Sequence, residues 1–566
     1  MDKQRSVRGM SIFLVSALIG LLTLACGAQS GQVIDLAKGE EQTKAAGGAS
    51  QQQSEQCSPG KEHWATQGPP VRGGTFQTAE ASAHLDPTDA VNVYRVVNGT
   101  YEWLVKMRMC FDSDTAAIPD LAEKWSVSPD GLTWTFNLRK DVKWQNLAPV
   151  NGRQFTSADI AWTLEYIKTS KASQRRFYEN VTHTEPDAYT VVLKLSEPNA
   201  DFLLMLGDDT NAALPHEIKD MYGDFKKVAV GTGPFQVREI RSEQSIVYDR
   251  NPNYYVMGAD GKPLPYAAGI QGFALADRAA TIAALRTGQQ DINRGSMTPA
   301  EGNLIKTAQP KSKIQPIAAT TNYAIWFNTT IPPWNDVRVR KAVSLGINRE
   351  DIITGGQGGG GIVSGFMPRM LGDFSWTEAQ IKERFKYDLE GAKKLLAEAN
   401  VSLKSPVKFA TGSSATYGQE MEVVSTQLTN LGIPNEAVIG ADGATASGTA
   451  IRSFKYDISY GPPGSCKFPD CWMRELVASG SGNITRMTDP KLDAMASAQA
   501  KEIDPVKRLK LVFEEQEYLL TLMPYVPTPT IVRQAYTSCR MKNMNPHHAL
   551  NSIWGIQHAW IDERGC

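Results

Sequence analysis

The feature that most constrains the fold of this 566-residue chain is a hairpin pattern in residues 118–146, IPDLAEKWSVSPDGLTWTFNLRKDVKWQN. Asp130-Gly131 indicates a turn, because both central positions of a tight two-residue hairpin turn favour positive φ. After the turn, apolar and polar residues alternate as in a strand with one buried face. The apolar positions are Leu132, Trp134, Phe136 and Leu138. Before the turn, residues 121–124 predict a short helical turn that begins near Pro119-Asp120. On pattern alone, this is a surface hairpin on a mixed α/β protein.

Length and composition indicate a globular protein with more than one core. The chain is 42% hydrophobic and 21% charged, which is enough for two or three lobes. Its net charge is −1 at pH 7. Binding to nucleic acid or to an anionic membrane surface needs a basic patch, and nothing in this balance favours either partner.

The N-terminus has the pattern of an export signal. Basic residues precede an apolar run of about 16 residues, shorter than the roughly 20 that a membrane-spanning helix needs. The run ends in LTLACG, which resembles a bacterial lipobox, although Thr23 stands where Leu is usual. We therefore predict a lipoprotein signal over residues 1–26 with Cys26 as the acylation site. The alternative is an ordinary signal peptide cleaved near this point, and either way the mature chain lies outside the cytoplasm.

Residues 27–70 are rich in Gly, Ala, Ser and Gln and have few large apolar side chains. Such a segment buries too little surface to offset its ordering entropy, so we predict a flexible tether. The folded part is expected to begin near Val71.

Apart from Cys26, the chain has six cysteines, and an even number in an exported protein favours disulfides. Six cysteines allow fifteen connectivities, among which the sequence alone does not choose. Our working assignment is Cys466–Cys471, Cys539–Cys566 and Cys57–Cys110. A metal site is the alternative, but neither Cys-x-x-Cys nor His-x₃-His spacing occurs.

Several other motifs follow the hairpin in a fixed order. FTSADI at 155–160 predicts a capped helix, and GTGPF at 231–235 leads into a strand that contains RNPNYY. NYAIWFNTTIPPWNDVRVRKAVSLGIN at 322–348 predicts a strand, a Pro-rich turn and a helix that starts at Asp336. Further helices are predicted over NGTYEWLV, within 94–105, and over 511–520.

Together with the hairpin, these motifs resemble family 5 extracellular solute-binding proteins, the peptide, nickel and sugar receptors of ABC importers. The resemblance extends from Val71 to the late 550s. It implies an α/β, two-lobed periplasmic-binding-protein-like fold with a hinge. We expect lobe I over 71–319, with an extra subdomain at about 110–225, lobe II over 320–526, and a C-terminal return to lobe I over 527–566.

The resemblance also implies a ligand site between the lobes, contacted by the first helix, the extra subdomain and a loop of lobe II. That loop is YGPPGSCKFPDCW, residues 460–472. Peptide-binding relatives usually carry W-x-x-D-Y-x-D-P there, and this loop departs from that pattern. Asp470 is either a substitute for the acid that binds a peptide's amino group or a solvated acid in a disulfide loop. The predicted cleft contacts are Tyr94, Arg176, Gln357, Tyr417, Tyr460, Asp470 and Trp472.

Enzyme and cofactor motifs are incomplete. Two S-x-x-K sequences occur without the S-D-N and K-T-G elements that a penicillin-binding enzyme needs, and no G-x-S-x-G is present. The run GGQGGGG at 355–361 lacks the Lys-Ser/Thr of a phosphate-binding loop, so a flexible segment that lines the cleft is the preferred interpretation. His547-His548 do not chelate as a pair, because adjacent side chains point apart. We predict no catalysis, no cofactor and no metal.

The predicted function is that of a lipid-anchored extracytoplasmic receptor. The receptor would be a monomer. It would capture a small solute, oligopeptide-like or oligosaccharide, and deliver this solute to an ABC importer permease. The alternatives are a sensor that presents its ligand to a signalling partner and, with less support, a secreted hydrolase.

Overall fold

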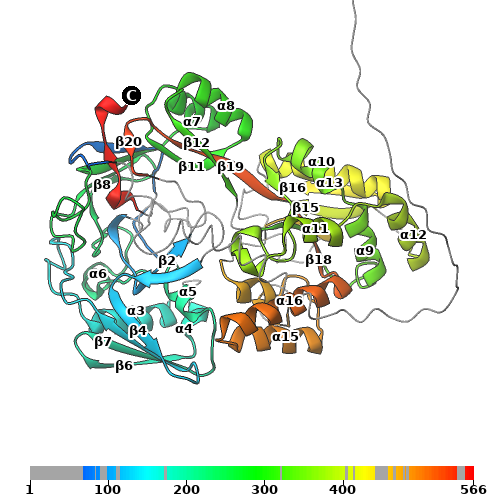
Figure 1. The fold of residues 1–566 in the computed structure, drawn as a ribbon, viewed down its shortest axis with the longest axis horizontal. Coiled ribbons are helices and arrows are strands. Elements are labelled where there is room, and N and C mark those ends of the chain that lie inside the picture. The colour runs from blue at the N-terminus through cyan, green and yellow to red at the C-terminus, as the bar shows by residue number, and fades with distance from the viewer. Residues whose placement is uncertain are drawn as a thin grey trace, which may run out of the picture. The chain divides into compact units, whose positions relative to one another are not determined.

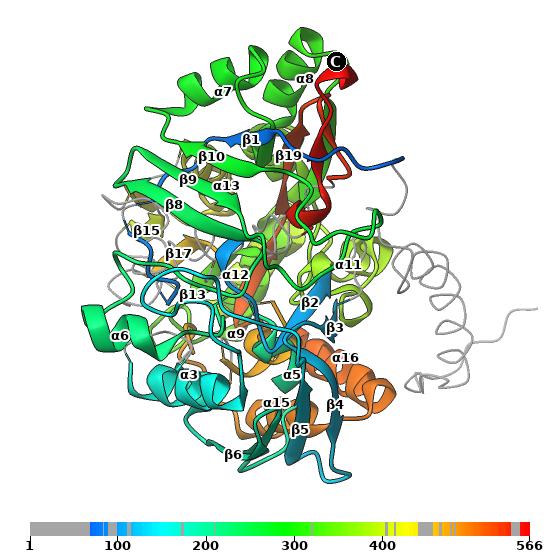
Figure 2. The same ribbon diagram turned by 90° about the vertical axis from the view of Figure 1, so that its left-hand side faces the viewer.

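The computed structural model describes most of the chain after residue 67 (Figures 1 and 2). The described residues are 68–82, 84–88, 99–109, 115–170, 175–208, 210–318, 321–401, 406–411, 415–439, 457–462, 467–475, 478–479, 483–544 and 555–566. The predicted signal, the tether and the His547-His548 pair lie outside them. Within these ranges, no helix has both the length and the hydropathy to cross a membrane.

The largest sheet is mixed and has eight strands, and Figure 2 shows several of them side by side. Its order is β12 (Lys313–Ala318), β19 (Thr530–Thr537), β11 (Ile292–Met297), β1 (Thr75–Thr78), β10 (Gly269–Phe273), β9 (Ser245–Arg250) and β8 (Phe235–Arg241). The eighth strand, β14 (Gly361–Ile362), pairs with β19. β1 runs parallel to both of its neighbours, and the remaining pairs are antiparallel. Two helices, α7 (Arg278–Arg286) and α8 (Pro299–Ala308), pack beside β11 and β12 (Figure 1).

A second sheet of five strands comes from the later part of the chain. Its order is β16 (Asn435–Ile439), β15 (Val407–Thr411), β17 (Ile458–Gly461), β13 (Tyr323–Phe327) and β18 (Tyr525–Thr528). The long helices around it are α9 (Val337–Gly346), α12 (Leu389–Ala399), α13 (Ala415–Leu431), α15 (Pro490–Lys501) and α16 (Pro505–Leu522). All five residues of β13 are buried, as expected for a strand covered on both faces.

The third sheet is antiparallel and contains the hairpin predicted over residues 118–146. Its order is β4 (Ala122–Val127), β5 (Thr133–Leu138), β7 (Thr190–Leu195) and β6 (Val181–Asp187). Helices α3 (Ser157–Thr169), α4 (Arg175–Tyr178), α5 (Phe202–Leu206) and α6 (His216–Tyr222) belong to the same part of the chain. Two-stranded ladders are formed by β2 (Val105–Met109) with β3 (Thr115–Pro119), and by β20 (Met541–Lys542) with β21 (Trp560–Ile561).

The hairpin forms, but its turn differs from the prediction. Of the two residues predicted to be central only Gly131 has a positive φ, of 72°, and its N–H donates to the Ser128 carbonyl at 2.8 Å, which makes Gly131 the last residue of the turn. Asp130 instead accepts from the Ser128 hydroxyl and from the Leu132 N–H through its side chain. The predicted helical turn at residues 121–124 is wrong, because this segment is the start of strand β4, which pairs with β5. The alternation in β5 is confirmed, with every second residue buried.

Most predicted helix starts are confirmed by their caps. The Thr156 N–H donates to Asp159 Oδ2 in the capping box of α3, and the Asp336 carboxylate accepts from the Arg338 N–H at the start of α9. The helix predicted at 511–520 lies within α16. The helix expected over NGTYEWLV is confirmed only at Gly99 and Thr100, because residues 101–104 are not helical and β2 begins at Val105.

Two large apolar cores support the sheets. One lies under the first and third sheets, and the other under the second sheet. Met205, on α5 beside the third sheet, belongs to the second core. The segment around α5 is therefore packed against the elements of the second sheet.

One predicted disulfide is confirmed, since Cys539 and Cys566 are bonded with a Cα–Cα distance of 5.2 Å. Cys471 is also disulfide-bonded, but its predicted partner Cys466 lies outside the described residues. Cys57 and Cys110 also lie outside them, as does Cys26. Those two pairings and the lipidation therefore stay predictions.

Apart from the short strand β14, the described chain passes between the two larger sheets at two places. It leaves β12 at Ala318 and enters β13 at Tyr323, and it returns from β18 at Thr528 to β19 at Thr530. The predicted lobe boundaries stay predictions, but these two crossings define where the site should be sought, since solutes bind preferentially at domain interfaces.

Candidate functional site

A buried polar network joins the two crossing segments. The Asn322 side chain is fully buried, and its Oδ1 accepts from Ser364 Oγ at 2.5 Å and from Thr530 Oγ1 at 2.9 Å. Its Nδ2 donates to the Gly365 carbonyl at 2.8 Å. The Asn322 side chain directs its hydrogen bonds to neighbouring groups of the protein, so this network stabilises the crossing and does not offer a ligand contact.

Next to the crossing lies a buried carboxyl group, that of Glu420 on α13. Its Oε2 accepts from the Tyr460 hydroxyl at 2.6 Å, and Thr528 Oγ1 approaches the same hydroxyl at 3.5 Å. Burial raises the pKa of Glu420 to about 7, while the Tyr460 hydrogen bond, the charge of Arg533 and the Gln357 amide lower it by less. Burial, and then the charge of Glu420, raises the pKa of Tyr460 well above its usual range, so its hydroxyl remains a donor.

Gln357 completes this cluster from the glycine-rich run. It follows the π-helical turn η2 (Ile352–Gly356), is 4% exposed, and donates from Nε2 to the Pro529 carbonyl at 2.9 Å. A Cβ on Gly361 would lie 1.9 Å from Gln357 Oε1, and one on Gly356 would lie 2.9 Å from the Glu420 Cα. Glycine is needed at both positions because the backbone of the run packs directly on these two side chains.

Two acceptor oxygens of this cluster are buried and have no hydrogen-bond partner among the described residues: Glu420 Oε1 and Gln357 Oε1. A buried acceptor without a hydrogen bond costs about 1–3 kcal/mol, so a proton, a water molecule or a ligand donor is expected there. We call Glu420, Gln357 and Tyr460 the acceptor cluster.

A second polar cluster surrounds Asp470, immediately before the π-helical turn η4 (Cys471–Glu475). Asp470 is 2% exposed, and its carboxylate accepts from Gln499 Nε2 at 3.1 Å and from Arg474 Nη2 at 2.6 Å. Its N–H donates to Asp201 Oδ2 at 2.9 Å. Asp470 is therefore a buried, hydrogen-bonded acid rather than a solvated one, while Trp472 is fully buried in the second core.

The same cluster links the α5 segment to the elements of the second sheet, and in both views α15 and α16 lie beside the third sheet (Figures 1 and 2). Arg508 on α16 forms a bidentate pair with Asp201, at 2.6 and 2.7 Å. Lys467 pairs with Asp208 at 3.1 Å. Burial acts to raise the pKa of Asp208, but the charge of Lys467 and hydrogen bonds from Thr210 lower it below its ordinary value. We call these two ion pairs the linking pairs.

The predicted contact residues thus fall into separate places. Gln357 and Tyr460 meet at Glu420, whereas Asp470 and Trp472 lie in the other cluster. Tyr94 lies outside the described residues, and Arg176 on α4 and Tyr417 on α13 have side chains outside them. Their binding roles stay predictions.

Sequence reasoning missed several residues that the structure brings into these clusters, namely Glu420, Asp201, Arg508 and Thr528. An isolated acid on a polar helix such as ATYGQEMEVVSTQLTNL usually belongs to a solvated face. Only the nearby glycine run gave a signal, because missing side chains allow close approach to the backbone.

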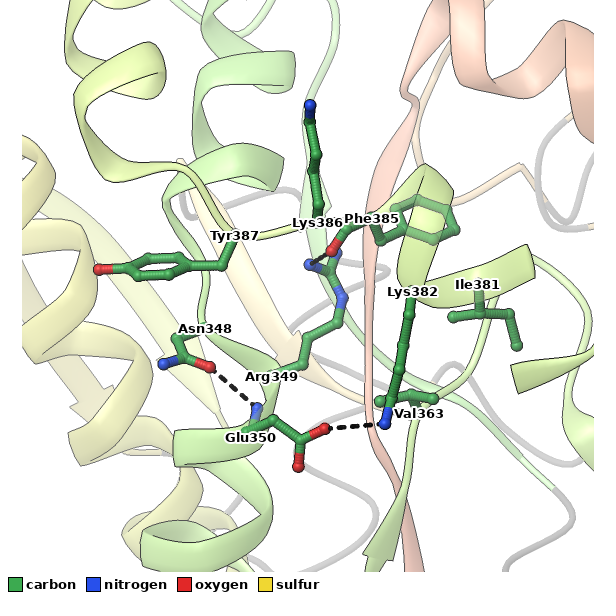
Figure 3. Close-up of a pocket in the computed structure, with 9 residues that line it drawn as sticks. All are labelled: Asn348, Arg349, Glu350, Val363, Ile381, Lys382, Phe385, Lys386 and Tyr387. Carbon is green, nitrogen blue, oxygen red and sulfur yellow. Dashed lines mark hydrogen bonds and ion pairs between the residues drawn. The ribbon is translucent and has the colours of Figure 1, made fainter. Parts of the chain in front are cut away.

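A pocket of about 270 Å³ opens elsewhere, at α10 (Arg349–Asp351) and α11 (Glu378–Arg384) (Figure 3). Its central guanidinium, that of Arg349, donates to the carbonyls of Phe385 and Pro527 at 3.0 Å each. Lys382 is paired with Glu350 and Glu378. These polar groups hold the surrounding backbone, so the pocket is a weaker candidate than the acceptor cluster.

The part of the chain that the structure describes contains no group of three or more His, Cys, Asp or Glu residues placed to hold a metal ion. The polar groups at the crossing are instead hydrogen-bonding side chains with apolar and aromatic neighbours. This arrangement suits an organic solute with a few directional contacts.

The fold is that of the two-lobed periplasmic binding proteins. The PBP AgaA from A. tumefaciens R10, solved in complex with agropinic acid, superposes with a TM-score of 0.71, at 23% identity and over 87% of this chain and 99% of that one. DppA from Helicobacter pylori in complex with the peptide STSA gives a TM-score of 0.71, at 21% identity and the same coverage.

Sequence similarity identifies the family to which the chain belongs. Residues 116–483 match the model of bacterial extracellular solute-binding proteins, family 5 middle, and the chain belongs to this family. A putative ABC transporter peptide-binding protein of Brucella ovis is 26% identical over 447 residues, which cover 72% of this chain and 79% of that protein. The glutathione-binding protein GsiB of Salmonella choleraesuis is 24% identical over 483 residues, or 81% of this chain and 88% of that one. The chain is therefore a solute-binding protein of the ABC-transporter type.

Proposed function

We propose that this protein is a receptor for a small peptide-like solute, which it encloses beside the two crossings and hands to the permease of an ABC importer. The observation that carries the solute class is the acceptor cluster, which offers buried oxygen acceptors next to the crossing. The names of the relatives support the same class, because the two described above are named for binding peptides and glutathione.

Enclosure works by exchanging hydration for contacts. A solute shifts the receptor from its open to its closed state only because it binds the closed state more tightly, and the shift is no larger than this difference in affinity. The permease would then distinguish loaded from empty receptor by the surface that the closed state presents. Acylation at Cys26 would hold the receptor at the membrane, with residues 27–70 as the tether that gives it reach.

A thermal-shift screen tests the solute class. The unacylated mature chain, starting at Gly27, is mixed with tripeptides, reduced glutathione, oligosaccharides or a nickel–histidine complex. A solute at 100 times its Kd adds about 2.7 kcal/mol to the free energy of unfolding, which is easily measured as a higher Tm. Stabilisation by tripeptides or glutathione supports the proposal. Stabilisation by oligosaccharides or the nickel complex alone would refute the peptide-like class, and no stabilisation by any solute would refute the receptor function as proposed.

The anchor and the permease need their own experiments. Cys26→Ser should move the protein from the membrane fraction to the soluble fraction of cells that express the full chain. Deleting the gene for the partner permease should abolish solute uptake while leaving binding to the purified receptor unchanged. Uptake that continues without this receptor would contradict its role in import.

A further inference from the structure

We propose that Glu420 and Gln357 are the residues that receive a primary ammonium group of the bound solute. This inference rests on the proposed function and makes it more specific, since it names the chemical group that is recognised and the side chains that recognise it. It assigns the contact to helix α13 and the glycine run, not to the loop at 460–472 that carries Asp470.

The hydrogen-bonding geometry carries this inference. Gln357 uses Nε2 on the Pro529 carbonyl, so its Oε1 is presented as an acceptor. Glu420 uses Oε2 on the Tyr460 hydroxyl, so its Oε1 is the second acceptor. Neither oxygen has a partner within hydrogen-bonding distance in the described part of the chain, although the Gln357 amide group adjoins the Glu420 carboxyl and acts on it as a donor. An ammonium group has three donors and no acceptor, which matches two neighbouring acceptors without a donor.

The cluster lies beside the two crossings between the larger sheets. Gln357 is bonded to Pro529, which lies between β18 of the second sheet and β19 of the first. Tyr460 lies on β17, next to β13 and its crossing. Arg533 on β19 acts on Glu420 from the first sheet. The cluster is thus formed by Tyr460 of the second sheet with Glu420 and Gln357 beside it, and Arg533 of the first sheet acts on it through its charge.

Asp470 is less suited to the same task. Its two carboxylate oxygens already accept from Gln499 and Arg474, and the neighbouring Asp201 is fully engaged by Arg508. A solute ammonium group at Asp470 would have to displace one of these donors. Glu420 Oε1 requires no such displacement.

When no solute is bound, a proton on the Glu420 carboxyl takes the place of the ammonium group. With its pKa at about 7, the Glu420 carboxyl is mostly neutral at pH 6, and the proton can be donated to Gln357 Oε1. When the ammonium group binds, the carboxyl ionises and the ammonium N–H groups donate to Glu420 Oε1 and Gln357 Oε1. The balance is one carboxylic acid and one ammonium ion giving one carboxylate–ammonium pair and one released proton. Binding is therefore expected to release a proton.

Glu420→Gln tests the role of the charge with little change of shape. Affinity is measured for tripeptides with a free amino group and for the same tripeptides after N-acetylation, which removes the ammonium charge. We expect the affinity of the variant for the free peptides to be lower by about 30-fold or more. This is the loss typical of removing one partner of a buried charge pair. For wild type, N-acetylation should cost a similar factor, and the variant should not discriminate between the two forms.

Glu515→Gln is the matched control. Glu515, on α16, is also a buried acid, and its pKa is raised by burial and then by the charge of Asp470. The charge that acts on it is that of Asp470 and not that of Glu420, so its variant should keep wild-type affinity for the free peptides. Loss of affinity in Glu515→Gln together with unchanged affinity in Glu420→Gln would overturn the inference in favour of the Asp470 cluster.

A second measurement needs no variant. Titration calorimetry at pH 6 in buffers of different ionisation enthalpy counts the protons released by wild type on binding the free peptides. A carboxyl with a pKa of about 7 should release most of one proton at pH 6, where the peptide's amino group is already protonated. Zero release at pH 6 would overturn the inference, as would equal binding of free and acetylated peptides. Both results would leave the proposed function intact, whereas absence of binding by any solute of the screen refutes both.

Discussion

The buried pair of Asp201 and Arg508 allows a quantitative prediction about stability. The two side chains are 0% and 6% exposed, and the guanidinium donates twice to the carboxylate. Asp201→Ala leaves the guanidinium buried without its counter-ion and removes the acceptor of the Asp470 N–H. Breaking a buried pair by removing one partner costs about 3–5 kcal/mol, because the desolvated charge that remains is not compensated.

The assay is equilibrium unfolding in urea, followed by tryptophan fluorescence. Asp201→Ala should lower the free energy of unfolding by about 3–5 kcal/mol. The control is Glu517→Ala, which breaks the Arg384–Glu517 pair, whose side chains are 24% and 49% exposed. A pair this exposed contributes about 0–1 kcal/mol, so the control should remain close to wild type.

The double variant Asp201→Ala/Arg508→Met separates a buried charge from a general packing defect. Replacing both charges removes the uncompensated cation, so the double variant should recover part of the loss. The reasoning is refuted if Asp201→Ala costs no more than Glu517→Ala, or if removing the Arg508 charge from the Asp201→Ala background causes a further loss of similar size.

Three other perturbations have defined outcomes. Because the folded state raises the pKa of Glu420 to about 7, it binds this proton more tightly than the unfolded state does. The free energy of unfolding should therefore fall by up to about 3 kcal/mol as the pH rises from 4.5 through 7, and Glu420→Gln should lack this decrease in pH-dependent urea unfolding; identical pH profiles would contradict it. Gly361→Ala places a Cβ 1.9 Å from Gln357 Oε1 and should weaken solute binding in the thermal-shift assay, whereas unchanged binding would mean that the amide is not part of the site. Replacing Cys539 and Cys566 by Ser should lower the free energy of unfolding by about 2–4 kcal/mol in urea, and an unchanged midpoint would show that this link adds no stability.

Local features of the fold could be predicted from the sequence, because the responsible residues are close together in the chain. The Thr156 and Asp336 caps and the alternation in β5 depend on neighbours within a few positions. The error at residues 121–124 has the opposite cause. That segment is a strand because it pairs with β5, and the tertiary pairing overrides the local helical preference. The overall architecture was accessible only through the resemblance carried by the ordered motifs.

The candidate site was predicted only in part. Gln357 and Tyr460 were chosen from a glycine run and an aromatic loop, and both contact Glu420, which no local pattern distinguished. Arg508 and Asp201 are separated by 307 residues, so no spacing rule connects them. Whether an acid such as Asp470 is solvated or buried depends on such distant partners.

The short strand β14 has a mechanical consequence. Gly361 and Ile362 pair with Ile531 and Thr530 of β19, and the Val532 N–H donates to the Gly360 carbonyl at 2.8 Å. The segment at Gly361 and Ile362 is thus hydrogen-bonded to β19, the strand by which the chain returns to the first sheet. This pairing adds a third backbone connection to the two covalent crossings. Bending between the sheets must therefore either break this pairing or also involve the backbone on one side of it, in β19 or next to Gly361 and Ile362. The glycine run thus limits how the molecule can flex.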